Sequence, residues 1–320
     1  MGIGEVRSQS YVCKAILEAP LSAERRHGLA YLLRGQDPLN VEALWQRLYH
    51  HTNRYGRRGA VIHAISGADL ALWDLCGKAV GKPLYELLGN GRRNCIRAYA
   101  SYLFGSTPKE TGELARLAVD LRLTAMKLGW GPFGQNLTQD LAHVEAARQS
   151  AGKRDVMVDA GQTFQVQPAL ERARLLPRFD IGWLEEPLSQ DDFRGYAELC
   201  AASPVPIAAA EGEVTRWGFE DLIKCGLHVL QLDVVICGGL TVARQVSELA
   251  RASQRRCIPH CFSTGINLAA SLHWMAAFGP ENALIEYCLR PSPLMRKLVR
   301  NLPPLVDGYV PVPQGPGLGV

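Results

Sequence analysis

The sequence predicts an α/β protein, a (β/α)8 barrel of the TIM type preceded by a smaller and mainly helical domain. Three observations support this fold class. From Ile96 to Cys288, eight short apolar segments alternate with amphipathic segments, which is the pattern of consecutive β/α units. Three of the apolar segments end in an acid, in two successive steps of 26 residues. The length of 320 residues suits one barrel and a small additional domain.

Residues 1–92 are predicted to form the first domain, because their apolar residues recur mainly at helical spacing. Helices are expected in an amphipathic stretch through Ile16 and Leu29, in VEALWQRLYHH and in AVIHAISGADLALWDLCGKAVG. Glycine and proline residues punctuate the end of the third helix, at Gly77, Gly81 and Pro83.

Residues 93–301 are predicted to form the barrel, with seven or eight β/α units. The expected strands lie in the segments IRAYASY, TAMKLG, VMVDAG, IGWLEEP, VPIAAAEG, VLQLDVV, RCIPHCF and NALIEYC. Residues 302–320 are rich in proline and glycine, so they are expected to form an extended tail that packs back on the first domain.

Composition restricts the kinds of partner. The net charge is only +4 and the basic residues are scattered, so a small-molecule carboxylate is the expected partner and nucleic acid is not. The N-terminus lacks a signal pattern and no apolar stretch approaches the roughly 18 residues of a membrane span, so we expect a cytoplasmic protein with no membrane partner. The nine cysteines form no CxxC pair, which favours reduced thiols.

Three acids are predicted to meet at one point. Asp159, Glu185 and Glu211 each end an apolar run, and a parallel barrel places the C-terminal ends of neighbouring strands side by side. Three carboxylates repel one another unless a cation lies between them. Anionic oxygen ligands favour Mg²⁺, with Mn²⁺ as a substitute, over zinc or copper. The sequence therefore predicts a magnesium site.

Neighbouring residues leave alternatives for this site. Glu213 could serve in place of Glu211, and Cys257 and Cys261 with His260 between them could bind a soft metal. Glu186 follows Glu185 directly, but the regular spacing selects Glu185 as the ligand. We expect Glu186 to lie outside the direct ligands and to support them through an ion pair with a neighbouring lysine or arginine.

Other strand candidates also end in ionisable residues, which apolar barrel packing does not require. These residues are Lys127, Asp233, His260 and Glu286. Arg58 lies in a loop before the long helix of the first domain and is a candidate contact for a substrate carboxylate or hydroxyl. The set outlines a site at one face of the barrel.

The segments VDAGQ, WLEEP, LDVVICGGLT and IPHCF, in this order and spacing, resemble the mandelate racemase branch of the enolase superfamily. The run SGADLALWDLCGKAVGKPLYELLG is similar to the helix that precedes the barrel in that family. The resemblance covers almost the whole chain. It implies a Mg²⁺-dependent enzyme that removes the proton next to a carboxylate through a metal-stabilised enediolate.

The resemblance also implies individual roles. Asp159, Glu185 and Glu211 would bind Mg²⁺. His260 would be the general base, paired with Asp233, whose carboxylate would select the tautomer and stabilise the imidazolium. Two further residues would contact the substrate carboxylate, Lys127 as a cation and Glu286 as an electrophile or hydrogen-bond donor.

One departure from the family pattern favours dehydration. Racemases of this branch carry a second lysine on the second strand, and Gly129 stands there instead and cannot move a proton. Dehydration needs only one abstracted proton and loss of the β-hydroxyl, so a dehydratase of a sugar acid or small hydroxy acid is expected. The segment of Trp130, Gly131 and Pro132 resembles sugar-acid dehydratases. Gly161 stands where the racemases of this branch have an asparagine near the substrate, which argues against mandelate itself as the substrate.

Two other functions remain open. One is a racemase or epimerase that uses Lys127 with His260. The other follows from the start of the chain, since GIGEV resembles only the end of the last strand of the family's α+β capping domain. The first strands of that domain are therefore expected to be absent, which would leave a truncated barrel that binds metal or ligand without turnover. The family resemblance also leads us to expect a homo-oligomer.

Overall fold

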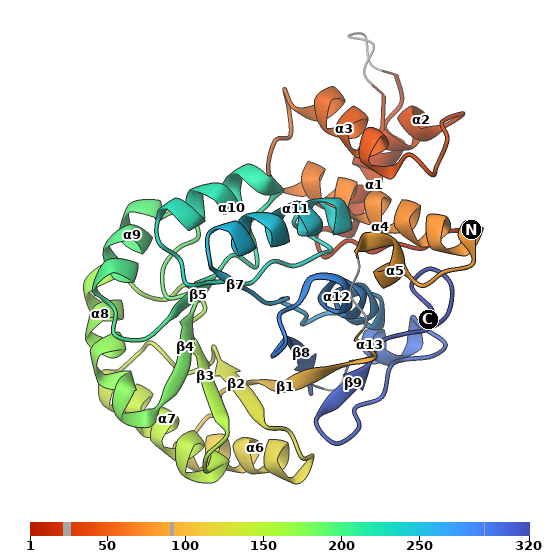
Figure 1. Cartoon of the computed structure of the whole chain (residues 1–320). Coiled ribbons are helices and arrows are strands. Elements are labelled where there is room, and N and C mark those ends of the chain that lie inside the picture. The colour runs from red at the N-terminus through yellow and green to blue at the C-terminus, as the bar shows by residue number, and fades with distance from the viewer. Residues whose placement is uncertain (22–26, 90–92, 291) are drawn as a thin grey trace.

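A computed structural model describes residues 1–21, 27–89, 93–290 and 292–320 of the chain. Its centre is a curled parallel sheet in the order β7-β6-β5-β4-β3-β2-β1-β8, with β9 antiparallel to β1 (Figure 1). The strands are β1 (Cys95–Leu103), β2 (Ala125–Gly129), β3 (Asp155–Asp159), β4 (Ile181–Glu185), β5 (Ile207–Ala209), β6 (Val229–Leu230), β7 (Arg256–Cys257), β8 (Leu284–Cys288) and β9 (Tyr309–Pro311). The predicted fold class, a TIM-like barrel domain with a capping domain, is confirmed.

Helices between the strands form the outer layer of this sheet (Figure 1). Several of these helices begin at a Thr, Asn or Asp whose side-chain oxygen accepts a hydrogen bond from a backbone N–H group of the first turn. These residue types are preferred at the start of a helix for this reason. These caps are Thr107, Asn136, Asp192 and Thr264. The helices are α6 (Pro108–Asp120), α7 (Leu137–Ala151), α8 (Val166–Leu175), η1 (Leu176–Phe179), α9 (Phe193–Ala202), α10 (Thr215–Lys224), α11 (Gly239–Ala252), α12 (Gly265–Phe278) and α13 (Pro293–Lys297).

The strand register brings the ends of consecutive strands to one level. Gly129 pairs with Asp159 across β2 and β3, and Asp159 pairs with Glu185 across β3 and β4. Residues at equivalent positions in consecutive β/α units therefore lie on neighbouring strands at the same height in the sheet. This register is the physical basis of the 26-residue spacing of the acids.

The later strands are shorter than the sequence patterns suggested. The seventh candidate, RCIPHCF, contributes only Arg256–Cys257 to the sheet, so His260 lies beyond its strand. Glu211 and Asp233 likewise follow β5 and β6. Within the described chain, β7 and β8 are the two ends of the strand order, so the sheet is not closed by hydrogen bonds between them. Residues after a strand have more freedom to turn toward the centre.

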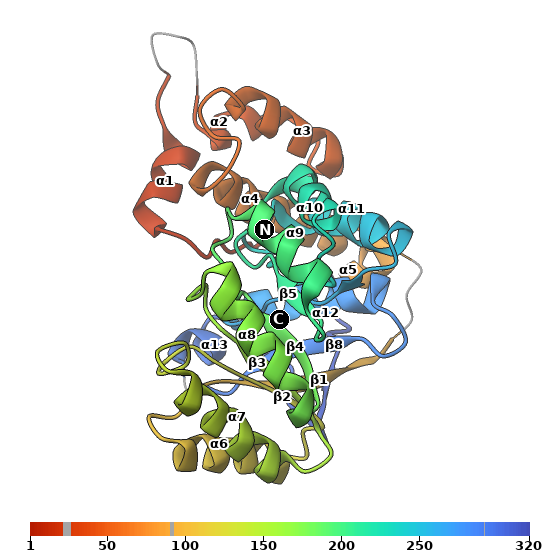
Figure 2. The same ribbon diagram turned by 90° about the vertical axis from the view of Figure 1, so that its left-hand side faces the viewer.

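The first domain packs beside the barrel as a group of helices (Figure 2). They are α1 (Ser10–Glu18), α2 (Leu29–Leu33), α3 (Val41–Thr52), α4 (Ala60–Val80) and α5 (Leu84–Leu88). The described residues before position 90 contain no strand, so the expected α+β character is not seen in them. The expected domain boundary at residue 92 lies outside the described residues.

Helix α4 connects the two parts of the molecule. Trp73 of α4 donates a hydrogen bond from its indole to Thr241 of α11 at 3.0 Å, and Asp69 accepts from the backbone N–H of Thr241 at 3.1 Å. By length and composition alone α4 could cross a membrane, contrary to the sequence expectation that no apolar stretch approaches that length. However, 61% of its apolar window is buried inside the protein, as in the core helix of a globular fold.

The C-terminal segment lies against α4 and α5. The backbone of Gly317 exchanges hydrogen bonds with Lys82 and Leu84, and the N–H of Leu318 donates to the carboxylate of Asp74 at 2.8 Å. Gly317 has φ +72°, and a Cβ there would lie 2.2 Å from Asp74 Oδ1, so only glycine fits.

Buried His273 of α12 forms hydrogen bonds with both α5 and the C-terminal segment, and its protonation makes the stability of the fold depend on pH. Its Nδ1 accepts from the backbone N–H of Tyr85 at 3.3 Å, and its Nε2–H donates to the carbonyl of Leu318 at 3.1 Å. This arrangement needs the neutral ring. Burial lowers the pKa of His273 to about 4.

Acid is therefore expected to weaken the fold through His273. The folded-state pKa lies below the usual 6.5, so the stabilisation is complete above pH 6.5 and is lost as the pH falls toward 4, by about 3 kcal/mol at most. We predict that the stability difference between wild type and His273→Gln, measured by urea unfolding, narrows between pH 7 and pH 4.5. A difference that stays constant over this range would contradict the assignment.

Candidate active site

A cavity of about 380 Å³ opens at the C-terminal ends of the strands. This volume falls in the range of small-molecule sites. Its wall combines residues from strand ends, from the loops that follow them and from the N-terminal segment. The lining residues are Arg7, Ser101, Tyr102, Leu103, Lys127, Trp130, Gly131, Asp159, Glu211, His260, Phe262, Glu286 and Arg290.

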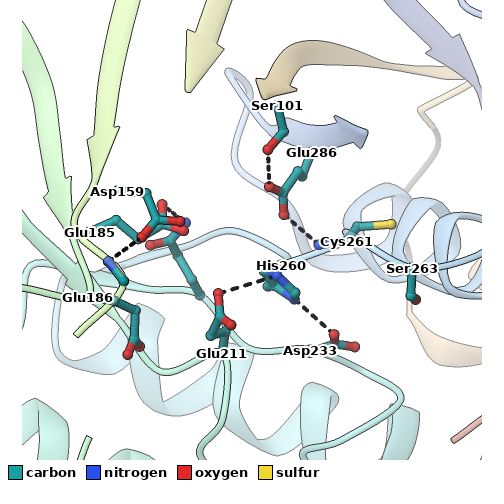
Figure 3. Close-up of polar contacts among 12 residues, drawn as sticks. Ser101, Asp159, Glu185, Glu186, Glu211, Asp233, His260, Cys261, Ser263 and Glu286 are labelled. Carbon is teal, nitrogen blue, oxygen red and sulfur yellow. Dashed lines mark hydrogen bonds and ion pairs between the residues drawn. The ribbon is translucent and has the colours of Figure 1, made fainter. Parts of the chain in front are cut away.

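The three predicted metal ligands meet at this cavity (Figure 3). One oxygen each of Asp159, Glu185 and Glu211 lies within 4.8 Å of the others. Asp159 and Glu185 are buried, and Glu211 is half-buried. Among the described residues this is the one cluster of metal-ligating type, so the alternative soft-metal site at Cys257 and Cys261 is not supported.

The charges around the cluster fit a bound cation. Burial raises the pKa of Glu185 to about 7 and that of Asp159 to about 6, although the charge of Lys127 lowers both. Carboxyl groups with raised pKa values at neutral pH lack sufficient positive charge nearby. A divalent cation ligated by these oxygens would supply it, and the all-oxygen donor set suits Mg²⁺.

Lys127 lies at the base of the cavity between acids from three strands. Its ammonium contacts a carboxylate oxygen of Glu185, lies 3.0 Å from Glu286 Oε1 and 3.8 Å from Asp159 Oδ2. Burial alone would lower the pKa of Lys127, but Glu185 and Glu286 raise it well above the usual value. The side chain is therefore a fixed cation at the place predicted for a substrate carboxylate.

His260 and Asp233 form the predicted dyad. Nδ1 of His260 lies 2.9 Å from Asp233 Oδ2, while Nε2 points toward the acid cluster, 3.3 Å from Glu211 Oε2 (Figure 3). Asp233 is held in turn by Nδ2 of Asn267 at 3.1 Å and by the N–H of Val235 at 3.0 Å. Asp233 thus holds Nδ1, and Nε2 faces the cavity with two neighbours, Glu211 and Arg7, whose NH1 lies 3.4 Å away.

The charge state of His260 depends on its acidic neighbours. Burial alone would lower its pKa, but Glu211, Glu286 and Asp233 outweigh that effect and raise the pKa to about 9. A cation held by Glu211 would oppose the effect of that carboxylate and favour the neutral ring that a base requires.

Glu286 differs from its expected role as a hydrogen-bond donor. Its oxygens accept from Ser101 Oγ and from the backbone N–H of Cys261, each at 2.7 Å (Figure 3). Oε1 also pairs with the ammonium of Lys127 at 3.0 Å. Burial alone would raise the pKa of Glu286, but Lys127 and His260 together lower it to about 2. The side chain is thus an ionised acceptor that anchors Lys127 in this structure.

Trp130 covers one side of the metal cluster. Its indole N–H donates to Asp159 Oδ2 at 3.1 Å, and the side chain is 51% exposed where it lines the cavity. Its φ of +59° is uncommon for a residue with a side chain. Gly161, with φ +57°, lies beneath the ring, and a Cβ there would be 3.0 Å from an indole carbon. The glycine that replaces the racemase asparagine therefore makes room for Trp130.

We predict that Trp130→Phe weakens Mg²⁺ binding about tenfold, because the ring remains while the hydrogen bond that orients Asp159 is lost. Isothermal titration calorimetry measures this change. Trp217→Phe is the matched control, since Trp217 is also exposed but does not line the cavity. Equal affinity in the two variants would mean that the indole does not orient the ligand.

Two charged residues that the sequence offered as candidates, Arg58 and Glu213, lie outside the cavity. Arg58 does not line the cavity: it is 53% exposed and lies 3.7 Å from Glu213 Oε2. Glu213 caps the backbone N–H of Val214 at 2.8 Å and lies outside the acid cluster, so Glu211 is the ligand candidate. Arg58 and Glu213 therefore form an ion pair with each other outside the cavity.

Glu186 contacts neither lysine nor arginine in the described structure. Its Oε1 accepts from the backbone N–H of Ala210 at 2.8 Å, and its Oε2 is buried without a hydrogen-bond partner. Burial and the nearby charge of Glu211 raise the pKa of Glu186 to about 8. The expected bridge to a basic residue is therefore wrong, and the side chain supports the β5 end instead.

Sequence reasoning missed several residues of the site. Arg7 NH1 lies 3.2 Å from His260 Nδ1 and 3.5 Å from Asp233 Oδ2, although it is 253 positions away from His260 in the chain. Gln231 and Trp183 both donate to Glu185 Oε2, at 2.7 and 2.8 Å. Gln231 lies two residues before Asp233, and the alternation of a strand could have signalled its inward direction. Arg7 had no such signal.

Comparison with known proteins gives a consistent family. Residues 110–320 match the enolase C-terminal domain-like family, and residues 1–89 match the mandelate racemase / muconate lactonizing enzyme N-terminal domain. Two relatives are each 32% identical. The D-galactarolactone cycloisomerase of Agrobacterium fabrum aligns over 89% of this chain and 78% of its own, and the arabinonate dehydratase of Saccharolobus solfataricus over 100% and 84%.

Solved structures extend this likeness to three dimensions. The 3,6-anhydro-D-galactonate cycloisomerase from Zobellia galactanivorans superposes with a TM-score of 0.89 at 30% identity, over 99% of this chain and 87% of its own. A mandelate racemase/muconate lactonizing protein from Paracoccus denitrificans, complexed with magnesium, gives 0.91 at 26% identity, over 99% and 86%. With both domains matched and the acid cluster in place, the chain belongs to the mandelate racemase/muconate lactonizing enzyme family of the enolase superfamily.

Proposed function

We propose that this protein is a Mg²⁺-dependent dehydratase of a sugar acid or small hydroxy acid. The observation that carries the proposal is the presence of one base in the cavity. His260 is held by Asp233, whereas position 129, across from Asp159, has no room for a second base. A Cβ at Gly129 would lie 2.5 Å from the Cβ of Asp159. One base suits elimination better than a two-base proton transfer.

The residues support the following reaction. The substrate carboxylate would lie beside Lys127 and the acid cluster, and Nε2 of His260 would remove the α-proton. Asp233 would stabilise the imidazolium through Nδ1. The electron pair from the broken C–H bond would move into the carboxylate, giving an enediolate. Mg²⁺ bound by the cluster would offset the negative charge of the substrate carboxylate.

Loss of the β-hydroxyl would complete the dehydration. The enediolate would re-form the carboxylate as the β-carbon–oxygen bond breaks, and His260 would return its proton to the departing oxygen, which leaves as water. The resulting enol would convert to a 2-keto-3-deoxy acid. Lys127 and Glu286 act by position and charge and transfer no proton in this scheme.

The comparisons support the proposal without deciding the reaction. One relative is an arabinonate dehydratase, and others are cycloisomerases. A magnesium complex is known for a structural relative, which supports Mg²⁺ as the metal. Proton abstraction beside a carboxylate would also serve cycloisomerisation, so this reaction is a second candidate. A racemase or epimerase would require Lys127 as a second base, yet Lys127 is paired with Glu185 and Glu286.

The test is incubation of the purified protein with Mg²⁺ and a panel of sugar acids and their lactones in deuterated water, followed by NMR. A 2-keto-3-deoxy product would support the dehydratase. An isomer of unchanged mass apart from deuterium would identify a cycloisomerase. Deuterium at the α-carbon of recovered substrate or its epimer would identify proton transfer alone. Metal binding without any of these changes would indicate a binding protein that lacks turnover.

We also propose, from the sequence, that the protein acts on a small-molecule carboxylate in the cytoplasm and assembles as a homo-oligomer. The small net charge supports a small-molecule partner over nucleic acid. Light scattering coupled to size-exclusion chromatography tests the assembly, and a monomer across micromolar concentrations would refute it.

A further inference from the structure

We propose that the protein has a second binding site, which takes a phosphate monoester of a small molecule in a pocket between the first domain and helix α10. This side pocket has a volume of about 740 Å³, within the range of small-molecule sites. Its wall includes Arg54, Arg57, Arg58 and Thr215, and it shares no lining residue with the cavity at the strand ends. The two sites are therefore separate.

The wall of the side pocket is positively charged. It carries three guanidinium groups and no carboxylate. These groups belong to Arg54, Arg57 and Arg58, which are exposed in the loop between α3 and α4. Arg58 lies 3.7 Å from Glu213, which does not line the pocket, whereas Arg54 and Arg57 form no ion pair with any residue that the structure describes. Three arginines against one glutamate leave two positive charges.

A hydroxyl group without a partner also opens onto the side pocket. Thr215 is 4% exposed, and within the described parts of the chain no group forms a hydrogen bond with its side chain. Its oxygen is not among the buried polar atoms that are sealed from solvent, and Thr215 lines the side pocket. The hydroxyl is therefore a donor that lacks an acceptor in the protein, which is rare for a polar side chain this deeply buried.

The first turn of α10 adds backbone donors. Thr215 begins this helix of 10 residues, no side chain caps its N-terminus, and Trp217 and Gly218 of the same turn line the pocket. The first N–H groups of a helix lack partners within it and attract anions. Glu213 also lies near this turn, since a Cβ on Gly218 would be 2.2 Å from its Oε1. A bound anion would repel this carboxylate, so binding depends on the arginines.

Contacts between the two domains hold the walls of the side pocket in place. Tyr49 of α3 stacks on Trp217 of α10 with ring centroids 5.1 Å apart, and Trp45 stacks on Tyr49 at 5.2 Å. The backbone N–H of Thr215 donates to the carbonyl of Cys237 at 2.8 Å. These contacts keep Thr215 at φ +60°, which is uncommon for a β-branched residue. A pocket that is already shaped costs a ligand less ordering on binding.

The charge of the side pocket favours a phosphate monoester over a carboxylate. A phosphate monoester carries about −1.5 to −2 charges at pH 7, close to the two positive charges that the protein leaves unbalanced, whereas a carboxylate supplies one. Its three terminal oxygens can accept from guanidinium groups, from a hydroxyl and from backbone N–H groups together. Guanidinium groups donate two parallel hydrogen bonds to phosphate and keep their charge at all accessible pH values.

The experiment is a calorimetric titration of the protein with phenyl phosphate and with benzoate, each with and without Mg²⁺. The two probes share a ring and differ in the anionic group. We expect one phenyl phosphate per chain, bound about tenfold or more tightly than benzoate, with the same affinity in both metal conditions. Binding that requires Mg²⁺ would place the probe at the acid cluster and overturn the proposal, as would equal affinity for the two probes or no binding at millimolar concentration.

Variants test whether the probe binds in the side pocket. Arg54→Met and Arg57→Met are each expected to weaken phenyl phosphate binding about tenfold, and Thr215→Val about threefold. Valine keeps the β-branched shape, and the hydroxyl has no partner in the protein, so thermal unfolding of Thr215→Val without ligand should match wild type. Arg116→Met is the matched control, an exposed arginine on α6 outside the side pocket. Wild-type affinity in all three pocket variants would overturn the proposal, as would an equal loss in Arg116→Met.

Discussion

Replacing His260 with asparagine is expected to lower kcat for dehydration by between about a hundredfold and ten-thousandfold, which is the usual contribution of a general base. His260 is the imidazole that joins the cavity to Asp233, at 2.9 Å, and its Nε2 faces the acid cluster. Asparagine can still hydrogen bond to Asp233 but cannot take a proton near neutral pH. The measurement is a steady-state assay with the acid that wild type prefers.

A second readout separates loss of the base from loss of the fold. Mg²⁺ affinity of His260→Asn should stay close to that of wild type, because the three ligand carboxylates remain. Exchange of the substrate α-proton with deuterated solvent should disappear together with product formation. Retention of rapid exchange in this variant would show that another group removes the proton, and Lys127 would then be the candidate.

Replacing Glu185 with glutamine is expected to weaken Mg²⁺ binding by more than about a hundredfold, since changes that only reorient a ligand already cost 10 to 100-fold. The change removes an anionic ligand from a buried cluster whose oxygens lie within 4.8 Å of one another. Turnover should fall with metal occupancy. Calorimetric titration with Mg²⁺ measures the affinity, and circular dichroism checks that the fold survives loss of the contact with Lys127.

The next residue supplies a close control. Glu186 is as buried as Glu185, but its pKa is raised to about 8 and its Oε1 only accepts from the backbone N–H of Ala210. Glutamine keeps that acceptor and is neutral, as the protonated acid is. Glu186→Gln should therefore bind Mg²⁺ nearly as wild type does. If both variants lost the metal equally, the assignment of Glu185 over Glu186 would be wrong.

Parallel pairing explains why the metal cluster could be predicted from spacing. Asp159 and Glu185 stand at paired positions of β3 and β4, so equal steps along the chain become equal heights in the sheet. Glu211 extends the same step although β5 ends two residues earlier. The positions of the acids were constrained by the fold, because each β/α unit places the end of its strand next to the end of the preceding strand around the barrel.

Spacing did not predict the positions of residues in loops or in the N-terminal segment. Arg58 was expected at the substrate and instead pairs with Glu213 outside the cavity, while Arg7 takes a place at His260. Neither Arg58 nor Arg7 belongs to the repeated β/α units. The direction of each side chain therefore depends on how the first domain packs against the barrel. Glu286 was placed correctly at its strand end, but its role as an acceptor depends on Lys127, which reaches it from another strand.

The sequence by itself determined the fold class and the acid cluster, because these follow from periodicity and register that local segments carry. Its ordered motifs indicated the family and, through that resemblance, the residue proposed as the base. Tertiary structure alone decided which side chains complete the cavity. Trp130 lies over Gly161, and Arg7 reaches His260, through contacts between segments far apart in the chain. Such contacts depend on domain docking and on side-chain packing, for which a single sequence contains no periodic signal.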